Sequence, residues 1–533
     1  MQKNILLLIA FLLFNYCFSQ EHAWVYFKDK PDATTFLANP LTMLSQKALD
    51  RRSKQNINLD SKDIPIAITY INTIKNAIGI KVKAKSKWLN ALHITGSEID
   101  INALTSLSFV DNVEFAANNL NSTTVLVKQT NNKFEVKTNF NYGSSTNQIE
   151  MLNGDFLHEQ DFTGAGMTIA VMDAGFPGVN TFTAFQRIRD NNQILDGYDF
   201  VHRSSGFYTG SSHGASVLST MAGFVDGQLV GTAPDANYYL FITEDISQET
   251  PLEESLWVEA AERADSLGVD IINTSLGYTT FDDARYNYTY ADMNGSTTFI
   301  TRGADIAFSR GMIVVNSAGN SGNNAWHYIG APADGFNVLS IGAVDGNENI
   351  TSFSSFGPTS DNRIKPDANA KGGGTTLINS SGNVSTANGT SFSSPVICGI
   401  IACLWQAYPD KTNAEIIQLI KESGHLYANP TDQEGYGIPN FENVFNGLLI
   451  DASFTADYKF FPNPFQESIQ FQFQNDVNNL QISIFDVLGK LVVVKEVTQQ
   501  NPTLSVTNLS QGIYILKIDQ NEKSRSFKMI KGK

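Results

Sequence analysis

Short, continuously apolar runs alternate with helical patterns through the middle of the chain, with Gly-rich corners between them. The clearest runs are residues 167–172, 270–273 and 312–315. Strands that are apolar throughout, with helices between them, are typical of a parallel sheet covered on both faces. We therefore predict an α/β domain at 142–449, in which a mostly parallel sheet is sandwiched by helices.

The stretch before this domain has a mixed pattern. Apolar and alternating segments predict strands at 24–27, 88–94 and 109–115, and helical spacing predicts a helix at 99–107. Residues 20–115 are therefore expected to form a separate α+β domain. Residues 116–141 are rich in Asn, Thr and Lys and hold few apolar residues, which is typical of a linker.

The last part of the chain changes to strict alternation of polar and apolar residues. Residues 468–474 and 480–484 alternate, Gly489-Lys490 marks a turn, and 513–518 follows as a further strand. Short alternating strands joined by tight turns are typical of antiparallel sheets. We predict a small antiparallel β-sandwich at 456–533.

The first residues have the pattern of an export signal. Lys3 precedes an apolar run at 5–14, which is too short to span a bilayer, and Cys17-Phe18-Ser19 supplies small residues before a cleavage point. We predict a signal peptide at 1–19 and a mature chain that starts at Gln20. A buried N-terminal strand or helix is the alternative, and a lipidated Cys17 is a weaker one.

Composition narrows the class of protein. The chain has 533 residues, of which 42% are hydrophobic and 17% charged, so it can bury a sizeable core and is not disordered throughout. The net charge of −16 argues against nucleic acid as a partner, because a phosphate backbone requires a basic face. After signal removal only Cys398 and Cys403 remain, and we expect buried free thiols rather than a disulfide.

Three segments of the middle domain each place one reactive side chain beside a helix or strand end. Asp173 ends an apolar strand, His213 opens a helix, and Ser391 lies near a helix start in Asn388-Gly-Thr-Ser-Phe-Ser-Ser-Pro395. Pro395 is expected to fall in the first turn, where amides lack intrahelical partners. A serine hydroxyl needs a base to become a nucleophile, and a carboxylate orients that histidine.

The order of these residues along the chain differs between the known families of serine hydrolases. The order is Asp173, His213, Ser391, which is the order of subtilisin rather than that of chymotrypsin or the α/β-hydrolases. Ser391 also lacks the Gly-x-Ser-x-Gly elbow of esterases. We predict an Asp-His-Ser triad for acyl transfer.

With these motifs, residues 142–449 resemble a subtilisin-like serine protease (subtilase). Asp173-Ala-Gly, His213-Gly and Gly389-Thr-Ser391-Phe-Ser-Ser-Pro395 match the three signature segments, and Asn316-Ser-Ala-Gly-Asn320 is similar to the oxyanion segment. The resemblance implies a secreted endopeptidase that works through an acyl-enzyme. It also implies that Asn320 and the backbone N–H of Ser391 stabilise the tetrahedral oxyanion.

The resemblance also implies where substrate binds. The edge Ser275-Leu276-Gly277 would pair with an extended peptide or protein substrate, and together with Ala318 and Gly319 it would wall the pocket for the residue before the scissile bond. These wall residues carry no charge, which favours an apolar or aromatic substrate residue.

Both flanks resemble known accessory segments. Residues 20–115 are similar to a subtilase propeptide in placement, which implies an inhibitor removed by self-cleavage within 116–141. Phe461-Pro-Asn-Pro464, Ile484-Phe-Asp-Val-Leu-Gly-Lys490 and the strand from Gly512 resemble the sorting domain of the type IX secretion system. That resemblance implies passage through the secretion machinery to the medium or the bacterial surface. A carbohydrate-binding or adhesive sandwich is the alternative.

Metal and cofactor signals are weak. Asp292-Met-Asn294-Gly295 could be a fragment of a calcium loop but lacks its acidic repeat, so no cofactor is predicted and calcium stays unassigned. The other six histidines have no metal spacing; these are His22, His93, His158, His202, His327 and His425. Glu253-Glu254 and Asp282-Asp283 are expected on solvated faces. Two other functions remain open: an inactive adhesive or scaffold protein, and a secreted esterase or amidase.

Overall fold

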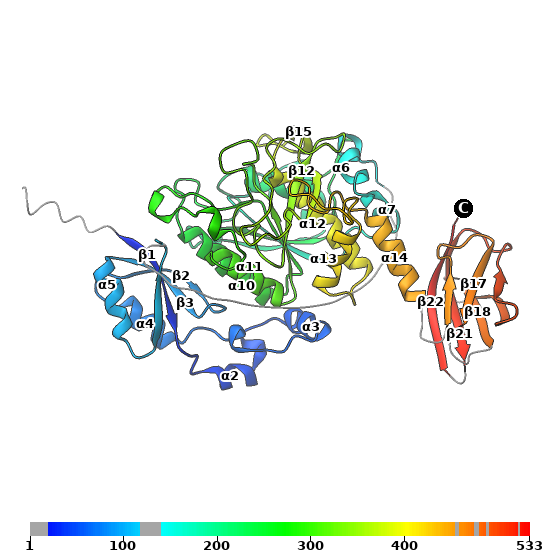
Figure 1. Ribbon diagram of the computed structural model, residues 1–533, viewed down its shortest axis with the longest axis horizontal. Coiled ribbons are helices and arrows are strands. Elements are labelled where there is room, and N and C mark those ends of the chain that lie inside the picture. The colour runs from blue at the N-terminus through cyan, green and yellow to red at the C-terminus, as the bar shows by residue number, and fades with distance from the viewer. Residues whose placement is uncertain are drawn as a thin grey trace, which may run out of the picture. The chain divides into compact units, whose positions relative to one another are not determined.

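The computed structural model describes residues 20–117, 140–453, 458–473, 479–486, 490–520 and 523–532. Two compact units follow one another along the chain, residues 1–440 and 441–533 (Figure 1). The predicted signal peptide at 1–19 lies outside the described residues, as does most of the predicted linker.

The N-terminal part of the first unit is a four-stranded antiparallel sheet in the order β2-β3-β1-β4. Its strands are β1 (Glu21–Phe27), β2 (Lys81–Ser86), β3 (Ala91–Gly96) and β4 (Val110–Phe115), and its helices are α4 (Ile68–Lys75) and α5 (Glu98–Ala103). Between β1 and α4 the chain makes a long excursion, residues 33–63, which we call the arm. The arm contains α2 (Ala33–Ala38), η1 (Pro40–Thr42), α3 (Gln46–Lys54) and η2 (Ser61–Asp63).

One predicted strand of this part starts too early. Trp88 and Leu89 lie in the turn between β2 and β3 rather than in a strand. The turn needs Asn90 at a φ of 52°, a conformation that asparagine tolerates. It is also fixed from outside, because the backbone N–H groups of Lys87 and Trp88 donate to Glu262 at 2.9 Å each.

The rest of the first unit is built on a seven-stranded sheet whose paired strands all run parallel, in the order β13-β12-β11-β10-β5-β9-β6. Its strands are β5 (Thr168–Asp173), β6 (Ile194–Asp199), β9 (Asn237–Ile242), β10 (Ile271–Thr274), β11 (Ile313–Ser317), β12 (Val338–Val344) and β13 (Ala368–Lys371). β5, β10, β11 and β12 are buried along their whole length. The predicted α/β fold is confirmed.

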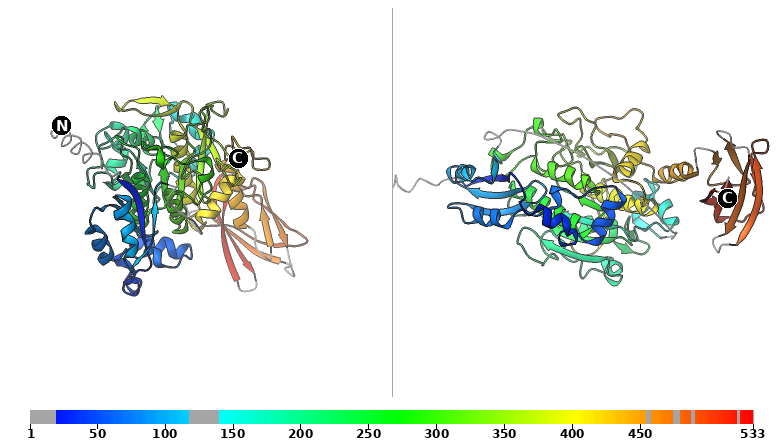
Figure 2. Two further views of the ribbon diagram at one scale, coloured as in Figure 1. Left: turned by 60° about the vertical axis from the view of Figure 1, so that its left-hand side comes forward. Right: turned by 90° about the horizontal axis from the view of Figure 1, so that it is seen from below.

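Helices cover both faces of this sheet (Figures 1 and 2). α10 (Leu252–Leu267) packs on α11 (Phe299–Ser309), and α9 (His213–Ala222) packs on α12 (Thr390–Ala407). α12 has the length and hydropathy of a membrane-spanning helix, but 89% of it is buried inside the domain, as expected of a core helix. It also carries Cys398 and Cys403, which are buried and unbridged as predicted.

The second unit contains α14 (Phe441–Ser453) and two antiparallel sheets, β16-β17-β20 and β19-β18-β21-β22. The strands are β16 (Tyr458–Phe461), β17 (Ser468–Phe473), β18 (Asn479–Asp486), β19 (Leu491–Thr498), β20 (Thr503–Ser505), β21 (Gly512–Gln520) and β22 (Lys523–Lys531). Alternate residues of these strands form one buried core, which includes Ile469, Phe471, Leu480, Ile482 and Leu516. The predicted antiparallel β-fold is confirmed, while the turn at Gly489 lies outside the described residues.

Candidate active site

Asp173 and His213 meet at the carboxyl end of the parallel sheet. Asp173 is the last residue of β5 and His213 the first residue of α9. His213 Nδ1 lies 2.8 Å from Asp173 Oδ1 and 3.1 Å from Oδ2, and Ala174 N donates to Oδ1 at 2.7 Å. The approach needs a glycine after the histidine, because a Cβ at Gly214 would lie 2.9 Å from that of Asp173.

The carboxylate changes the acidity of the imidazole. Asp173 is only 3% exposed, so its charge acts on His213 through a poorly solvated medium. The Asp173 carboxylate raises the pKa of His213 above its ordinary value of 6.5, against the opposing effect of burial. The hydrogen bond also places the ring proton on Nδ1, which leaves Nε2 as the basic nitrogen.

Ser391 lies at the second position of α12 and is 8% exposed. Pro395 is the sixth residue of this helix, so the prediction that it lies in the first turn is wrong. Pro395 cannot donate to the carbonyl of Ser391, its normal partner four residues back. The hydroxyl of Ser275 donates to that carbonyl instead, at 2.8 Å, and so offsets the missing helical bond.

Among the described residues, no hydrogen bond joins His213 to Ser391. The Ser391 hydroxyl instead donates to the carbonyl of Ser275 at 3.4 Å, a long contact. Phe392, the next residue of α12, lies close to His213, with 5.8 Å between the ring centroids. For its proton to pass to the imidazole, the Ser391 hydroxyl has to turn away from the carbonyl of Ser275.

The predicted substrate residues come together at one pocket of about 150 Å³. Its lining joins the end of β10 to the end of β11 and includes Ser391 and Asn320. The predicted wall residues Ser275, Leu276, Gly277, Ala318 and Gly319 all line it. Trp326 and Tyr328, two aromatic residues that also line it, were not foreseen from the sequence. None of the lining residues is charged.

A group of carboxyls lies close to the triad and was not foreseen. Glu244 follows β9 and accepts a hydrogen bond from the hydroxyl of Tyr278 at 2.8 Å. Burial, with repulsion from Glu249 and Asp173, raises the pKa of Glu244 well above its ordinary range. Tyr278 directly follows the Ser275-Leu276-Gly277 edge, so this bond connects that edge to the end of β9, the strand that pairs with β5 beside Asp173.

Glu253 and Glu254 are buried rather than solvated, being 2% and 0% exposed, so that prediction is wrong. Both carboxylates have partners that the local sequence does not reveal. Glu253 accepts from the backbone N–H of Asp245 at 2.7 Å, and Glu254 accepts from the hydroxyl of Tyr288 at 2.7 Å. Burial raises the pKa of Glu254 to about 7. Asp282 is exposed, as predicted.

The calcium fragment at 292–295 is engaged in local hydrogen bonds. The Asp292 carboxylate accepts from the N–H and the hydroxyl of Thr289, and the Asn294 side chain accepts from the N–H of Ser296. Within the described ranges, no group of three or more His, Cys, Asp or Glu side chains is arranged to hold a metal ion.

Three family models match successive parts of the chain. A model described as "Peptidase S8 propeptide domain, Bacteroidota" matches residues 22–135, and one described as "Subtilase family" matches residues 164–438. A third, described as "Secretion system C-terminal sorting domain", matches residues 459–532. All three resemblances seen in the sequence are therefore confirmed.

Curated relatives are similar to about half of this chain. Subtilisin DY of Bacillus licheniformis is 28% identical over 270 residues, which is 50% of this chain and 87% of the relative. Subtilisin E of Bacillus subtilis (strain 168) is 29% identical over 298 residues, which is 55% of this chain and 69% of the relative. Among solved structures, MycP1 with its N-terminal propeptide removed covers 56% of this chain and 96% of that chain, at 23% identity and a TM-score of 0.44.

Proposed function

The chain belongs to the subtilase family, and from that premise we propose that Ser391, His213 and Asp173 are its nucleophile, general base and orienting carboxylate. The protein is a secreted serine endopeptidase that carries a propeptide domain and a type IX sorting domain. The observation that supports these roles most directly is the Asp173–His213 pair at 2.8 Å beside an uncharged pocket that includes Ser391.

In the proposed reaction His213 Nε2 accepts the hydroxyl proton of Ser391 while the serine oxygen attacks the scissile carbonyl. Asp173 stabilises the imidazolium that forms. The carbonyl oxygen becomes an oxyanion, which the side-chain amide of Asn320 and the backbone N–H of Ser391 stabilise. That N–H is available because the first amides of a helix have no intrahelical acceptor. His213 then gives its proton to the leaving amine, and the acyl-enzyme remains. In the second half of the reaction His213 Nε2 accepts a proton from water while the water oxygen attacks the acyl carbon. The proton then returns to the Ser391 oxygen as the acid product leaves.

The substrate is an extended peptide that pairs with the Ser275-Leu276-Gly277 edge. We expect an apolar or aromatic side chain before the scissile bond, because a charged group in the 150 Å³ pocket would be desolvated without a partner. A peptide-library cleavage profile tests this. Leu, Met or Phe at that position should exceed Lys and Glu by at least about 10²-fold in kcat/KM, as expected of an unpaired buried charge. Equal cleavage of lysine substrates would contradict it.

The propeptide is proposed to inhibit the precursor and to be removed by self-cleavage within 116–141, a segment that lies mostly outside the described residues. To test this, the Ser391→Ala variant is expressed with no other protease present, and removal of its propeptide is followed over time. Removal of the propeptide at the wild-type rate in that variant would show that another enzyme does the cutting.

Casein and a short ester, each tested with and without a serine-reactive phosphonyl fluoride, separate an endopeptidase from an esterase and from an inactive scaffold. We expect inhibitor-sensitive hydrolysis of casein. Ester hydrolysis with intact casein would favour the esterase, and loss of neither substrate would favour the scaffold.

The sorting role is tested by deletion of residues 456–533. The deletion should abolish export of the enzyme, and unchanged extracellular activity would contradict that role.

A further inference from the structure

The propeptide region contacts the catalytic domain through two patches. In the first, the sheet packs on α10 and α11: Trp24 stacks on Phe299 with ring centroids 4.6 Å apart, and Ser86 donates to Glu262 at 2.6 Å. In the second, the arm lies along the carboxyl ends of the same two helices, where α3 contacts α10 (Figures 1 and 2). The arm thus adds a second set of contacts to those made by the sheet.

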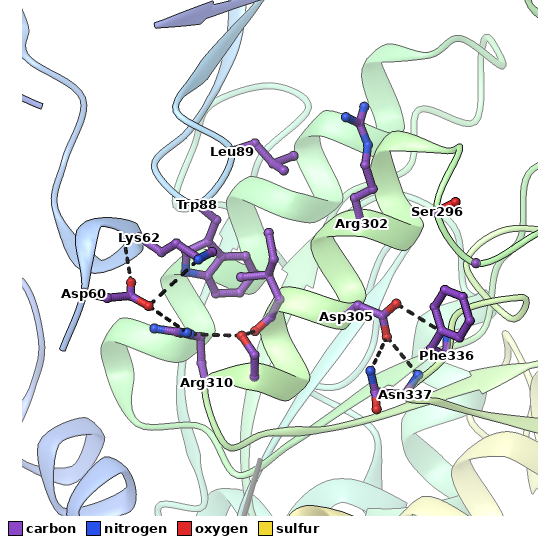
Figure 3. Close-up of a pocket in the computed structure, with 13 residues that line it drawn as sticks. Asp60, Lys62, Trp88, Leu89, Ser296, Arg302, Asp305, Arg310, Phe336 and Asn337 are labelled. Carbon is purple, nitrogen blue, oxygen red and sulfur yellow. Dashed lines mark hydrogen bonds and ion pairs between the residues drawn. The ribbon is translucent and has the colours of Figure 1, made fainter. Parts of the chain in front are cut away.

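A cavity of about 420 Å³ lies between the two patches (Figure 3). Trp88 and Leu89 border it from the sheet, Asp60 and Lys62 border it from the arm, and Arg302 is among the residues of α11 that line it. On the α11 side the cavity separates the two patches. On α10 they meet at Ser266, whose hydroxyl accepts from Lys87 Nζ at 2.9 Å and whose carbonyl accepts from the N–H of Ser45 at 2.8 Å.

The centre of the arm patch is a buried cluster of charges. Arg52 Nη2 donates to both oxygens of Asp265, at 2.8 and 2.7 Å, and Arg51 donates to the same carboxylate. Exposure is 5% for Arg51, 1% for Arg52 and 0% for Asp265. The two arginines hold the pKa of Asp265 at about 2 despite its burial. Among the described residues, the ion pairs of Asp265 are with these two arm residues.

The arm also binds backbone carbonyls that lie just after the two helices. Arg51 donates to the carbonyls of Val269, just after α10, and of Arg310, just after α11. Gln55 donates to the carbonyl of Gly311 at 3.0 Å. The carboxyl end of a helix carries partial negative charge, so a cationic donor beside it is favourable.

Charge complementarity extends beyond the two arginines. Lys47, one turn before Arg51 on α3, lies 2.7 Å from Asp270 and 2.6 Å from the hydroxyl of Thr168. An ion pair of the opposite sense joins Arg310 Nη2 of the catalytic domain to Asp60 Oδ2 of the arm at 3.2 Å. The surface thus matches a helix that presents basic side chains at successive turns.

We propose that the carboxyl ends of α10 and α11 form an exosite that binds a basic helical segment and retains the propeptide after the chain is cut. The exosite consists of Asp265, Val269, Asp270, Arg310 and Gly311. None of these residues lines the 150 Å³ pocket. The inference deepens the proposed inhibition by the propeptide: cleavage in the linker does not by itself free the enzyme, because the arm keeps the inhibitor attached at a second site.

The test is made in the full-length Ser391→Ala chain with a specific-protease recognition sequence inserted within 116–141. The chain is cut at that sequence, and dissociation of the propeptide is followed by native mass spectrometry and size exclusion. This design needs no self-cleavage, so its outcome does not depend on whether Ser391 is the nucleophile. The parent should keep its propeptide bound.

The variant Arg51→Ala/Arg52→Ala should lose the propeptide about 10²-fold faster, as expected when a buried charge pair is broken. Lys54→Ala is the matched control, because Lys54 is exposed on the same helix, and it should behave as the parent. Asp265→Asn removes the charge from the catalytic side and should reproduce the fast release even if the double variant does not accumulate. Release at the parental rate in either arginine or aspartate variant overturns the proposal.

Discussion

The side-chain oxygen of Asn320 accepts two hydrogen bonds from Thr390, one from its backbone N–H at 2.9 Å and one from its hydroxyl at 3.0 Å. The Thr390 hydroxyl oxygen in turn accepts from the N–H of Gly319 at 3.2 Å, so its own proton is directed to Asn320. Two donors identify the bonded atom of Asn320 as its oxygen. The amide nitrogen is thereby left to face a substrate, as an oxyanion donor requires.

Replacing Asn320 by alanine should lower kcat by roughly 10²–10³-fold, the loss known for the corresponding asparagine of subtilisin. KM should change little, since the amide interacts more strongly with the oxyanion than with the ground-state carbonyl. Steady-state kinetics on a peptide substrate measure both constants. Asn323→Ala, on the same loop and exposed, is the control. A change in KM with kcat unaffected would contradict the role of Asn320 as an oxyanion donor.

Thr390 is expected to act as a positioning residue for Asn320. Thr390→Val keeps the backbone donor but loses the hydroxyl, so the asparagine retains one of two fixed contacts. We expect kcat to fall by about tenfold, the value of one hydrogen bond, with KM unchanged. Thr390→Ser should restore the wild-type kcat. Failure of the serine to rescue would mean that the methyl group, and not the hydroxyl, carries the effect.

The pH profile reports on Asp173. Because the Asp173 carboxylate raises the pKa of His213 above 6.5, the wild-type acidic limb of kcat/KM should lie above that pH: activity is lost as pH falls and the imidazole becomes protonated. Asp173→Asn removes the charge, so the limb should move to lower pH while kcat drops by about 10⁴-fold. If the acidic limb of kcat/KM lies at the same pH in Asp173→Asn as in the wild type, a group other than His213 titrates there.

A histidine pair packed between the propeptide sheet and α10 should make propeptide binding depend on pH. His22 Nδ1 lies 2.8 Å from His93 Nε2, and His93 Nδ1 lies 2.7 Å from the Ser255 hydroxyl of α10. Burial, reinforced by Lys83, lowers the pKa of His22 to about 4 against the weaker pull of Glu21 and Asp283. Burial also lowers the pKa of His93 well below 6.5. Both are neutral when docked, so their contribution is complete above pH 6.5 and is lost as pH falls toward 4.

Retention of the cut propeptide should therefore be weaker at pH 5 than at pH 7.5, by roughly 10- to 30-fold for each histidine that becomes solvated on release. Glu262 opposes this trend, because docking raises its pKa to about 7 and favours its protonated form. The comparison with His22→Asn/His93→Gln, which removes both titrations but keeps amide groups, isolates the histidines. The same pH dependence in that variant would contradict the assignment.

The proposed catalytic residues could be identified in the sequence because each lies in a short, informative segment. Asp173 ends a strand, His213 starts a helix and Ser391 stands two residues after Gly389 near a helix start. Their order along the chain and the match of these segments to the subtilase family singled them out. The wall residues Ser275 to Gly277 came from the resemblance to the subtilase family, and they line one pocket. Their partners Trp326 and Tyr328 come from a loop without regular pattern, and no local signal placed them.

What the sequence did not reveal depends on contacts between distant segments. Glu253 and Glu254 have the pattern of a solvated helix face, yet their partners are loop N–H groups and a tyrosine more than thirty residues away. The same holds for Arg51 and Arg52, which look like surface charges on a short helix until Asp265 is brought beside them. Buried charges are found only when both members of the pair have been placed.

The identity of the nucleophile is the central claim, and labelling tests it most directly. Processed enzyme is treated with a serine-reactive phosphonyl fluoride and the adduct is mapped by peptide mass spectrometry, alongside casein hydrolysis by the Ser391→Ala variant. The account predicts a single adduct on Ser391 in proportion to lost activity, and a fall of about 10⁶-fold in the variant, the loss known for the subtilisin serine. An adduct on another residue, or a variant that still hydrolyses casein at the wild-type rate, would contradict it.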